Sequence, residues 1–320
     1  MDLISPVNMK RNHGEYIARI NRVIDFIMNN LDKQHTVPEL AAIACFSEYH
    51  FHRIFRLIVG ESLNVYVRRA RLERAANMVR LNPRQSITEI ALDYGFSSSA
   101  NFAKAFRAHF DITPSEYRLL YLEKSRNGKT NSKNGKVNSS PMKDYGITLN
   151  QLEPVELPNV EIKPLPPLHL AYVRTLQGYD ESSIEEAWDK LITWARARGM
   201  INDDTLTLGI EHDDPELSGL DSCRYDACIT IPERITNFDG EIGVQDLPGG
   251  IYVTYTFTVH NNVGEMMGRS YSEIFQWIVA NGIVPANSSS YSLYHDPFEM
   301  DEGRPARITI CIMIQPMATN

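Results

Sequence analysis

The stretches TVPELAAIACFSEYHFHRIF (36–55) and SITEIALDYGFSSSANFAKAF (86–106) decide the fold of the first part of this chain, because they repeat one pattern 50 residues apart. Thr36 and Ser86 each stand three residues before a glutamate, the capping-box spacing that begins a helix. The match continues into the next helical segment, with one residue added in the second copy. The repeat predicts two copies of one helical unit.

Each copy predicts a short helix, a tight turn and a second helix, which together form a helix-turn-helix. The second helix is expected to be capped by Ser47 in the first copy and by Ser97 in the second. Ala41 and Ala91 stand where the two helices cross, and a small side chain there permits close packing. The apolar positions of the second helices recur at helical spacing and are predicted to face a core. They are Phe51, Ile54, Phe55 and Ile58 in the first copy, and Phe102, Ala105 and Phe106 in the second.

The opposite faces of these second helices carry side chains that suit contact with DNA. Arg53 can donate two hydrogen bonds to a guanine, while the smaller side chains of the second copy predict weaker base discrimination. A solvated helix face is the alternative interpretation. The predicted DNA-contacting residues are Tyr49, His52, Arg53, Arg56, Ser98, Ser99, Asn101, Lys104 and Arg107.

Charge is divided unevenly along the chain, although the net charge is only −8. Residues 1–143 hold 22 Lys and Arg against 13 Asp and Glu, and residues 144–320 hold 10 against 27. Such asymmetry indicates a half that binds a polyanion and a half that avoids one. Charge blocks can also serve solubility alone, so this observation supports the DNA interpretation without establishing it.

A polar stretch, SRNGKTNSKNGKVNSSP (125–141), separates two textures of sequence and predicts a flexible linker. We therefore expect an all-α DNA-binding domain at 1–124, a linker at 125–143 and an α+β domain at 144–320. In the first domain the pattern predicts a helix at 64–81. In the second it predicts strands at 168–173, 226–231, 251–258 and 307–314, with helices near 183–198 and 265–281.

The start of the chain lacks a secretory signal, and no run of about 18 apolar residues is present, which predicts a cytoplasmic protein without a membrane segment. The four cysteines form no C-x-x-C pair and are expected to be reduced and buried. We expect neither a metal nor a cofactor.

The acidic half also repeats itself, at a constant shift of 83 that aligns Trp194 with Trp277 and Cys228 with Cys311. A duplicated fold creates a seam between its copies, and seams lined with aromatic residues favour ligands. For each aromatic residue, ordinary core packing is the alternative. The predicted effector-binding residues are Tyr172, Trp194, Glu211, Tyr255, Trp277, Tyr291 and Tyr294.

The first 120 residues resemble the AraC/XylS family of transcription regulators, most clearly in GFSSSANFAKAFRAHFDITPSEYR (95–118). The resemblance implies double-stranded DNA and RNA polymerase as partners, with both recognition helices in adjacent segments of the major groove. Tyr49, His52 and Arg53 match base-contacting positions of one branch of that family. The operator cannot be inferred, because the second recognition helix departs from the family's longer polar residues.

Residues 145–318 resemble the GyrI-like effector-binding domain, through EIKPLPPLHLAYVRTLQGY (161–179) and YSLYHDPFE (291–299). The resemblance implies a small hydrophobic or aromatic effector. Family members carry a glutamate where this chain has Ser292, which puts a cationic ligand in doubt and leaves Glu211 as a weak substitute. Two alternatives are a small-molecule hydrolase and a protein-interaction or sequestration module; the chain shows no G-x-S-x-G or H-E-x-x-H motif, so we expect no enzyme.

Overall fold

The structure is a computed structural model, and it describes residues 6–126, 157–175, 178–232, 235, 240–260, 262–286, 288, 290–295 and 305–316. Residues 127–143 of the predicted linker lie outside these ranges. Among the described residues, no helix is both long and apolar enough to cross a membrane.

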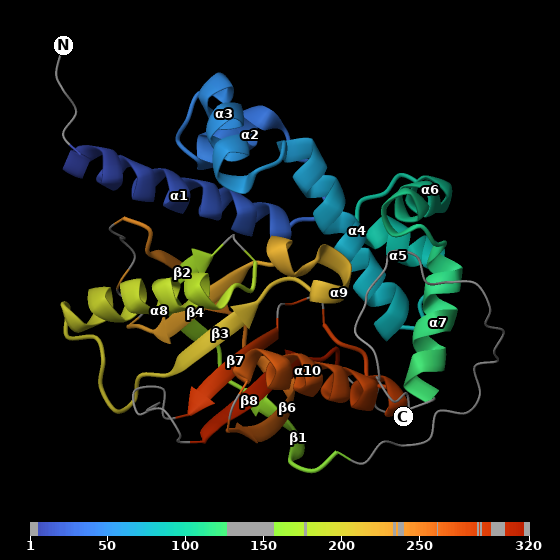
Figure 1. Cartoon of the computed structure of the whole chain (residues 1–320). Coiled ribbons are helices and arrows are strands. Elements are labelled where there is room, and N and C mark those ends of the chain that lie inside the picture. The colour runs from blue at the N-terminus through green and yellow to red at the C-terminus, as the bar shows by residue number, and fades with distance from the viewer. Residues whose placement is uncertain are drawn as a thin grey trace.

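The described residues of the first part are helical (Figure 1). The helices are α1 (Pro6–Met28), α2 (Val37–Ile43), α3 (Glu48–Val59), α4 (Leu63–Leu81), α5 (Ile87–Asp93), α6 (Ser99–Phe110) and α7 (Pro114–Arg126). The pairs α2–α3 and α5–α6 are the two predicted helix-turn-helix units, and α4 joins them. The last two residues of α7 are the first two of the predicted linker.

The capping residues at 36 and 86 act as the sequence predicts. Thr36 accepts a hydrogen bond from the backbone of Glu39, and at Ser86 both halves of the capping box form. The turns use a left-handed residue, with φ of 53° at Cys45 and 73° at Gly95. Cys45 is exposed in that turn, so its predicted burial is wrong, whereas Cys223, Cys228 and Cys311 are buried.

Each helix-turn-helix unit has its own apolar core, and α4 belongs to both. The first core contains Phe51 and Phe55 at 0% exposure, packed against α1. The second contains Phe102 and Phe106, also at 0%. The residues that α4 supplies to the first core are Leu63, Tyr66 and Ala70, and those it supplies to the second are Leu72, Ala75, Ala76, Met78 and Val79.

The described residues of the second part form one eight-stranded antiparallel sheet with helices packed on it. The strands are β1 (Val160–Leu165), β2 (Leu168–Thr175), β3 (Thr207–Glu211), β4 (Tyr225–Thr230), β5 (Gly243–Leu247), β6 (Gly250–Val259), β7 (Ser290–His295) and β8 (Ala306–Met313). The helices are α8 (Glu181–Arg196), the short α9 (Pro215–Ser218), a 3-10 turn η1 (Leu220–Ser222) and α10 (Val263–Ala280). The predicted α+β class is confirmed.

The strand order is β1-β6-β8-β7-β3-β4-β2-β5. From the centre outward, the order β3-β4-β2 of one copy corresponds to the order β7-β8-β6 of the other. One copy is β2-α8-β3-β4 and the other is β6-α10-β7-β8, as the shift of 83 predicts. The edge strands are exchanged, because β1 pairs with β6 of the second copy and β5 pairs with β2 of the first. This exchange was not predicted, since a repeat does not reveal which copy a strand joins.

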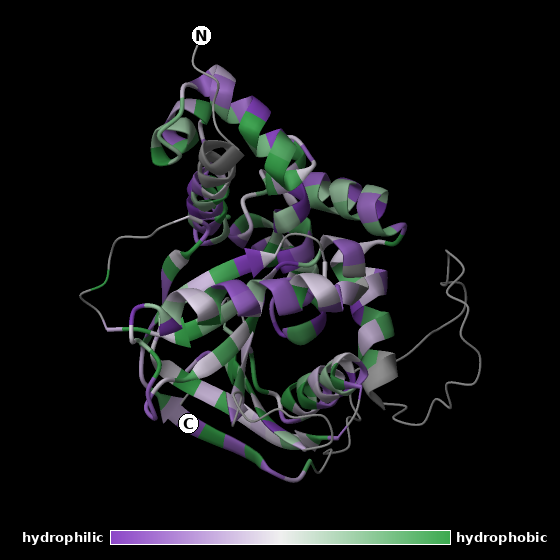
Figure 2. Ribbon diagram, turned by 60° about the vertical axis from the view of Figure 1, so that its left-hand side comes forward, coloured by the Kyte–Doolittle hydropathy of each residue, from purple (hydrophilic) through white to green (hydrophobic). Residues whose placement is uncertain are grey.

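The two long helices of this part cover the outer strands on one face of the sheet. Helix α8 packs on β2 and β4, and α10 packs on β6. The central strands β3 and β7 therefore lie between the two helices. We call their side chains on this face, together with the side chains of α8, α10, β4 and the segment before α8 that pack against them, the seam. The other face of the sheet is turned toward α1 (Figure 1). Figure 2 shows hydrophobic and hydrophilic residues alternating around the helices, as packing on one side requires.

Candidate nucleic-acid interface and small-molecule site

The outward face of α3 presents its predicted DNA-contacting residues to solvent. Tyr49 is 75% exposed, and His52, Arg53 and Arg56 are exposed as well. The Arg53 guanidinium lies 5.8 Å from the centre of the Tyr49 ring. This cation-π contact restrains a long side chain before any ligand arrives. Helix α3 has well-defined ends, because Ser47 caps its N-terminus and Gly60 ends it in a left-handed conformation.

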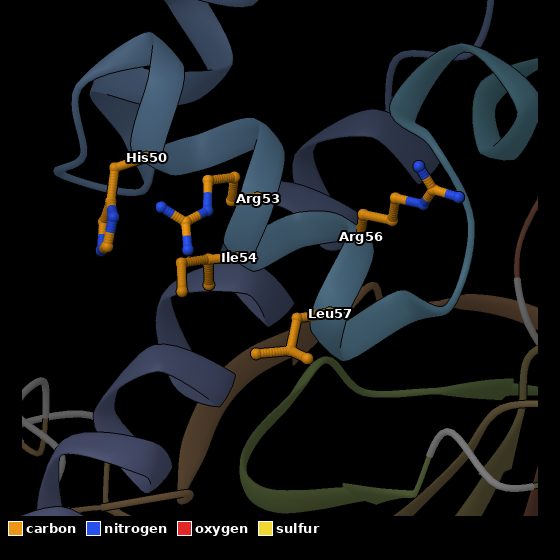
Figure 3. Close-up of a pocket in the computed structure, with 5 residues that line it drawn as sticks. All are labelled: His50, Arg53, Ile54, Arg56 and Leu57. Atoms are coloured by element: carbon orange, nitrogen blue, oxygen red, sulfur yellow. The ribbon is translucent and has the colours of Figure 1, made fainter.

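A pocket of about 450 Å³ lies beside this face, and Figure 3 shows the α3 residues that line it: His50, Arg53, Ile54, Arg56 and Leu57. Arg53 lies near His50, whereas Arg56 points away from both. Leu57 was not predicted as a contact, although it is 76% exposed. It stands four residues after Arg53 and so shares its helix face, which is the signal that could have found it.

We call the faces of α3 and α6 that carry the predicted DNA-contacting residues the reading faces. On the reading face of α6, some of these residues are exposed and others are partly buried. Asn101, Lys104 and Arg107 are exposed, whereas Ser98 and Ser99 are partly buried. Ser98 is the N-cap, and its hydroxyl accepts from the backbone of Asn101. The sequence placed this cap at Ser97, one residue too early, because the second turn is longer by one residue.

The seam holds a carboxylate at its centre. Glu211 ends β3, and its side chain accepts hydrogen bonds from the Tyr271 hydroxyl at 2.7 Å and the Ser292 hydroxyl at 3.1 Å. Burial raises the pKa of Glu211 to about 7, although both hydrogen bonds oppose this rise. Ser292 lies on the neighbouring strand β7, so the carboxylate from β3 stands beside the position where the expected glutamate is missing from the sequence.

Aromatic side chains surround this carboxylate. The hydroxyls of Tyr225 and Tyr294 are 3.1 Å apart, and the Trp188 indole donates to Tyr225 at 3.0 Å. Trp188 also meets the Tyr294 ring edge-on, with centroids 5.7 Å apart. A Cβ at Gly209 would lie 2.5 Å from the Tyr225 hydroxyl, so only glycine leaves room for that ring.

Of the predicted effector-binding residues, the structure brings Glu211 and Tyr294 together in the seam. Tyr172 instead donates to Asp25 of α1, and Tyr255 donates to Glu273 of α10. The remaining three, Trp194, Trp277 and Tyr291, pack into apolar clusters of the sheet and its helices.

The seam residues that sequence reasoning missed are Trp188, Tyr225, Tyr271 and Ser292, together with Tyr179, whose pKa is raised by burial and then by Glu211. The repeat held a signal for them, because a shift of 83 relates Trp188 to Tyr271 and Glu211 to Tyr294. Equivalent positions of the two copies thus meet at the seam, and they carry different side chains.

The raised pKa of Glu211 predicts a pH-dependent stability. A carboxyl whose pKa is higher in the folded state binds its proton more tightly there, so its contribution to stability is lost as the pH rises from about 4.5 through 7. We expect Glu211→Gln to exceed the wild-type chain in unfolding free energy by about 1–3 kcal/mol at pH 8, with equality at pH 4.5. Urea denaturation at both pH values measures this, with Glu185→Gln on the exposed face of α8 as control. An equal difference at both pH values would contradict it.

Comparison with known protein families agrees with this two-part organisation. The profile described as a helix-turn-helix domain matches residues 40–119, and the profile of the GyrI-like small molecule binding domain matches residues 158–315. The transcriptional activator AarP of Providencia stuartii is 36% identical over 115 residues, which are 36% of this chain and 84% of that protein. The chain belongs to the AraC family of transcriptional regulators.

Two further relatives are similar to this AraC-family regulator. The regulatory protein SoxS of Salmonella typhimurium is 34% identical over 99 residues, covering 31% of this chain and 92% of SoxS. The transcriptional regulator Rob of the same organism is also 34% identical over 99 residues, but the match covers only 34% of Rob. The chain is thus a DNA-binding transcriptional regulator with a GyrI-like small-molecule binding domain.

Proposed function

We propose that α3 and α6 read two adjacent segments of the major groove. The observation that carries this is the exposure of both reading faces, with Tyr49 and Arg53 already in contact on α3. The proposed contacts are Tyr49, His52, Arg53, Arg56, Ser98, Ser99, Asn101, Lys104 and Arg107. Ser98 keeps its hydroxyl on the helix cap, so its contact is through the backbone amide at the N-terminus of α6, which favours a phosphate.

We propose further that the bound protein acts on transcription through RNA polymerase in the cytoplasm, as a regulator rather than an enzyme. Its relatives SoxS, Rob and AarP are named as regulators or activators, which supports this assignment.

Selection of bound duplexes from a randomised library, across a salt series, tests the DNA-binding proposal. We expect a bipartite motif whose two blocks lie about one helical turn apart. Enrichment of no sequence, with no binding at low salt, would overturn it.

The proposed effector is an aromatic cation that binds in the seam. A partly accessible carboxylate among tyrosine and tryptophan rings offers an ion pair and cation-π contacts to such a molecule, and an apolar neutral ligand would leave that carboxylate unpaired. The proposed contacts are Glu211, Tyr294, Trp188, Tyr179, Tyr225 and Tyr271. In this proposal the other predicted positions stabilise the domain and do not contact the effector. They are Tyr172, Trp194, Tyr255, Trp277 and Tyr291.

A matched pair of probes tests the charge preference. Phenyltrimethylammonium and tert-butylbenzene have the same shape and differ in one positive charge. We expect calorimetry at pH 8 to show about tenfold tighter binding of the cation, and Glu211→Gln to abolish that preference. Because the pKa of Glu211 is about 7, we also expect the cation to bind about tenfold more weakly at pH 6 than at pH 8. Equal binding of both probes by the wild-type chain would reject a cationic effector.

A further inference from the structure

The two parts of the chain are joined by a buried polar interface. Its first anchor is Asp25 on α1, which accepts hydrogen bonds from the Tyr172 hydroxyl at 2.8 Å and the Arg174 guanidinium at 2.7 Å. Arg174 is also bound by Asp226 through two contacts of 2.6 Å, and its side chain is fully buried. Such pairing requires a defined geometry, because a buried charge that loses its partner is strongly unfavourable.

A second anchor is on α4, in the part of that helix that packs in the core of the first helix-turn-helix unit. The hydroxyl of Tyr66 accepts a hydrogen bond of 2.8 Å from Arg224, the residue just before β4. Arg224 is held in turn by Asp213, at 2.7 and 2.5 Å. Tyr66 is 1% exposed and its ring belongs to the first unit's core. Arg224 of the sheet domain therefore binds a residue of the first unit's core.

A third set of anchors belongs to the second unit. Arg80, at the far end of α4, pairs with Asp214. Leu217 of α9 packs against the core of the second unit. Val279 of α10 meets Leu122 of α7 in a small apolar cluster. The same sheet domain thus contacts residues in the cores of both helix-turn-helix units.

This docking leaves both reading faces open. Arg53 on α3 and Lys104 on α6 are exposed to solvent although the sheet domain is docked. In Figure 1, α3 lies across α1 from the sheet. A sheet domain that only shielded DNA-contacting residues would cover these faces, and this one does not.

The strand β3 connects the interface to the seam. Glu211 points into the seam, whereas the next residue, His212, contacts Asp226 at 2.7 Å on the other face of the sheet. The two residues after that are Asp213 and Asp214, which bind Arg224 and Arg80. A shift of β3 at Glu211 would therefore move the anchors of both units together.

We infer that the sheet domain is a brace that fixes the relative orientation of the two helix-turn-helix units, and that β3 transmits effector binding to this brace. The inference builds on the proposed DNA reading and effector site. Its core claim, that docking sets the orientation of α3 relative to α6, concerns the protein alone and can be measured without DNA or ligand.

The first test measures the distance between spin labels on the two reading helices of the full chain. Labels are placed by Glu48→Cys on α3 and Ala108→Cys on α6, with the exposed Cys45 changed to serine. The docking variant is Asp25→Ala with Tyr66→Phe and Asp214→Asn. The first two changes leave Arg174 paired with Asp226 and Arg224 paired with Asp213. The third replaces the charged partner of Arg80 with an amide of the same shape, whose oxygen can still accept from Arg80. Asp246→Asn with Tyr255→Phe is the control, because Asp246 is 79% exposed and pairs with His169 of the sheet domain, and Tyr255 donates to Glu273 of α10.

We expect a narrow distance distribution in the wild-type and control chains, and a distribution at least twice as broad in the docking variant. If the docking variant keeps the narrow distribution, α4 alone fixes the two units and the brace is refuted. This result does not depend on whether the chain binds DNA, so it is distinguishable from failure of the proposed function.

A disulfide that locks the docked state gives an independent test. A Cβ at Gly14 of α1 would lie 3.2 Å from the Glu241 Cγ, so Gly14→Cys with Glu241→Cys places two sulfurs within bonding reach in a Cys45→Ser chain. When oxidised, this chain should retain the narrow distribution, even with the docking substitutions added.

On duplexes whose two blocks are moved apart or together by one base pair, we expect the locked chain to discriminate about tenfold and the unlocked docking variant to discriminate less than threefold. Loss of all DNA binding on oxidation, reversed by reduction, would instead show that docking blocks DNA and would overturn the brace.

Discussion

Replacing Arg53 with alanine is expected to weaken binding of the full chain to its preferred duplex by about tenfold to a hundredfold. Arg53 is exposed on α3 and ordered by the Tyr49 ring, so it can donate both guanidinium hydrogen bonds to one base. The loss should be confined to the block of the motif that α3 reads. Fluorescence anisotropy with the selected duplex, and with duplexes changed in either block, measures both effects.

Arg269→Ala is the matched control, because this arginine is 72% exposed on α10 and pairs only along its own helix with Glu273 in the described structure. It should leave DNA affinity unchanged within about twofold. A uniform loss across all sequences in the Arg53 variant would show that Arg53 contacts a phosphate and reads no base.

Replacing Asp226 with alanine is expected to lower the unfolding free energy by about 3–5 kcal/mol, the largest effect on stability that we predict. Asp226 is 0% exposed and receives hydrogen bonds from Arg174 and His212. Its loss leaves the buried Arg174 guanidinium with Asp25 as its remaining carboxylate partner among these contacts, across the interface. Urea denaturation monitored by circular dichroism provides the measurement.

The pKa of Asp226 predicts how the difference in unfolding free energy between the wild type and Asp226→Ala varies with pH. Burial opposes ionisation of Asp226, but Arg174 and His212 outweigh it, so the pKa of Asp226 lies well below its ordinary value. A lowered folded-state pKa stabilises above the unfolded pKa of about 4, and that stability is lost as the pH falls toward the folded value. The gap between wild type and Asp226→Ala should therefore narrow below pH 4. Asp246→Ala, at an exposed carboxylate, should change stability by less than about 1 kcal/mol at any pH.

The helix-turn-helix half was readable from sequence because its determinants are local. Ser86 and Glu89 are three residues apart and form their capping box without help from the rest of the chain. Phe102 and Phe106 fall on one helix face by periodicity alone, and both are buried. The cap at Ser98 was misplaced by one residue, since a one-residue insertion in a turn changes which serine meets the helix end.

The seam was only partly readable. The repeat predicted that two copies would meet, and Glu211 and Tyr294 are equivalent positions that do meet there. Trp194 and Trp277 are also equivalent, yet they pack under their own helices. Both tryptophans lie on helices, α8 and α10, and the side of each helix that packs on the sheet decides which of its residues faces the seam.

The amino-acid sequence was enough to predict the two helix-turn-helix units, the duplicated α+β module and the division of charge between them, because caps, periodicity and repeats are properties of neighbouring residues. Tertiary packing was needed to establish that β1 and β5 exchange partners, that a carboxylate from β3 stands beside Ser292, and that Asp25 and Tyr66 meet Arg174 and Arg224. These contacts join residues up to 158 positions apart in the chain. A charge buried at such a contact must be paired, because an unpaired buried charge is strongly unfavourable, and no local pattern specifies the partner.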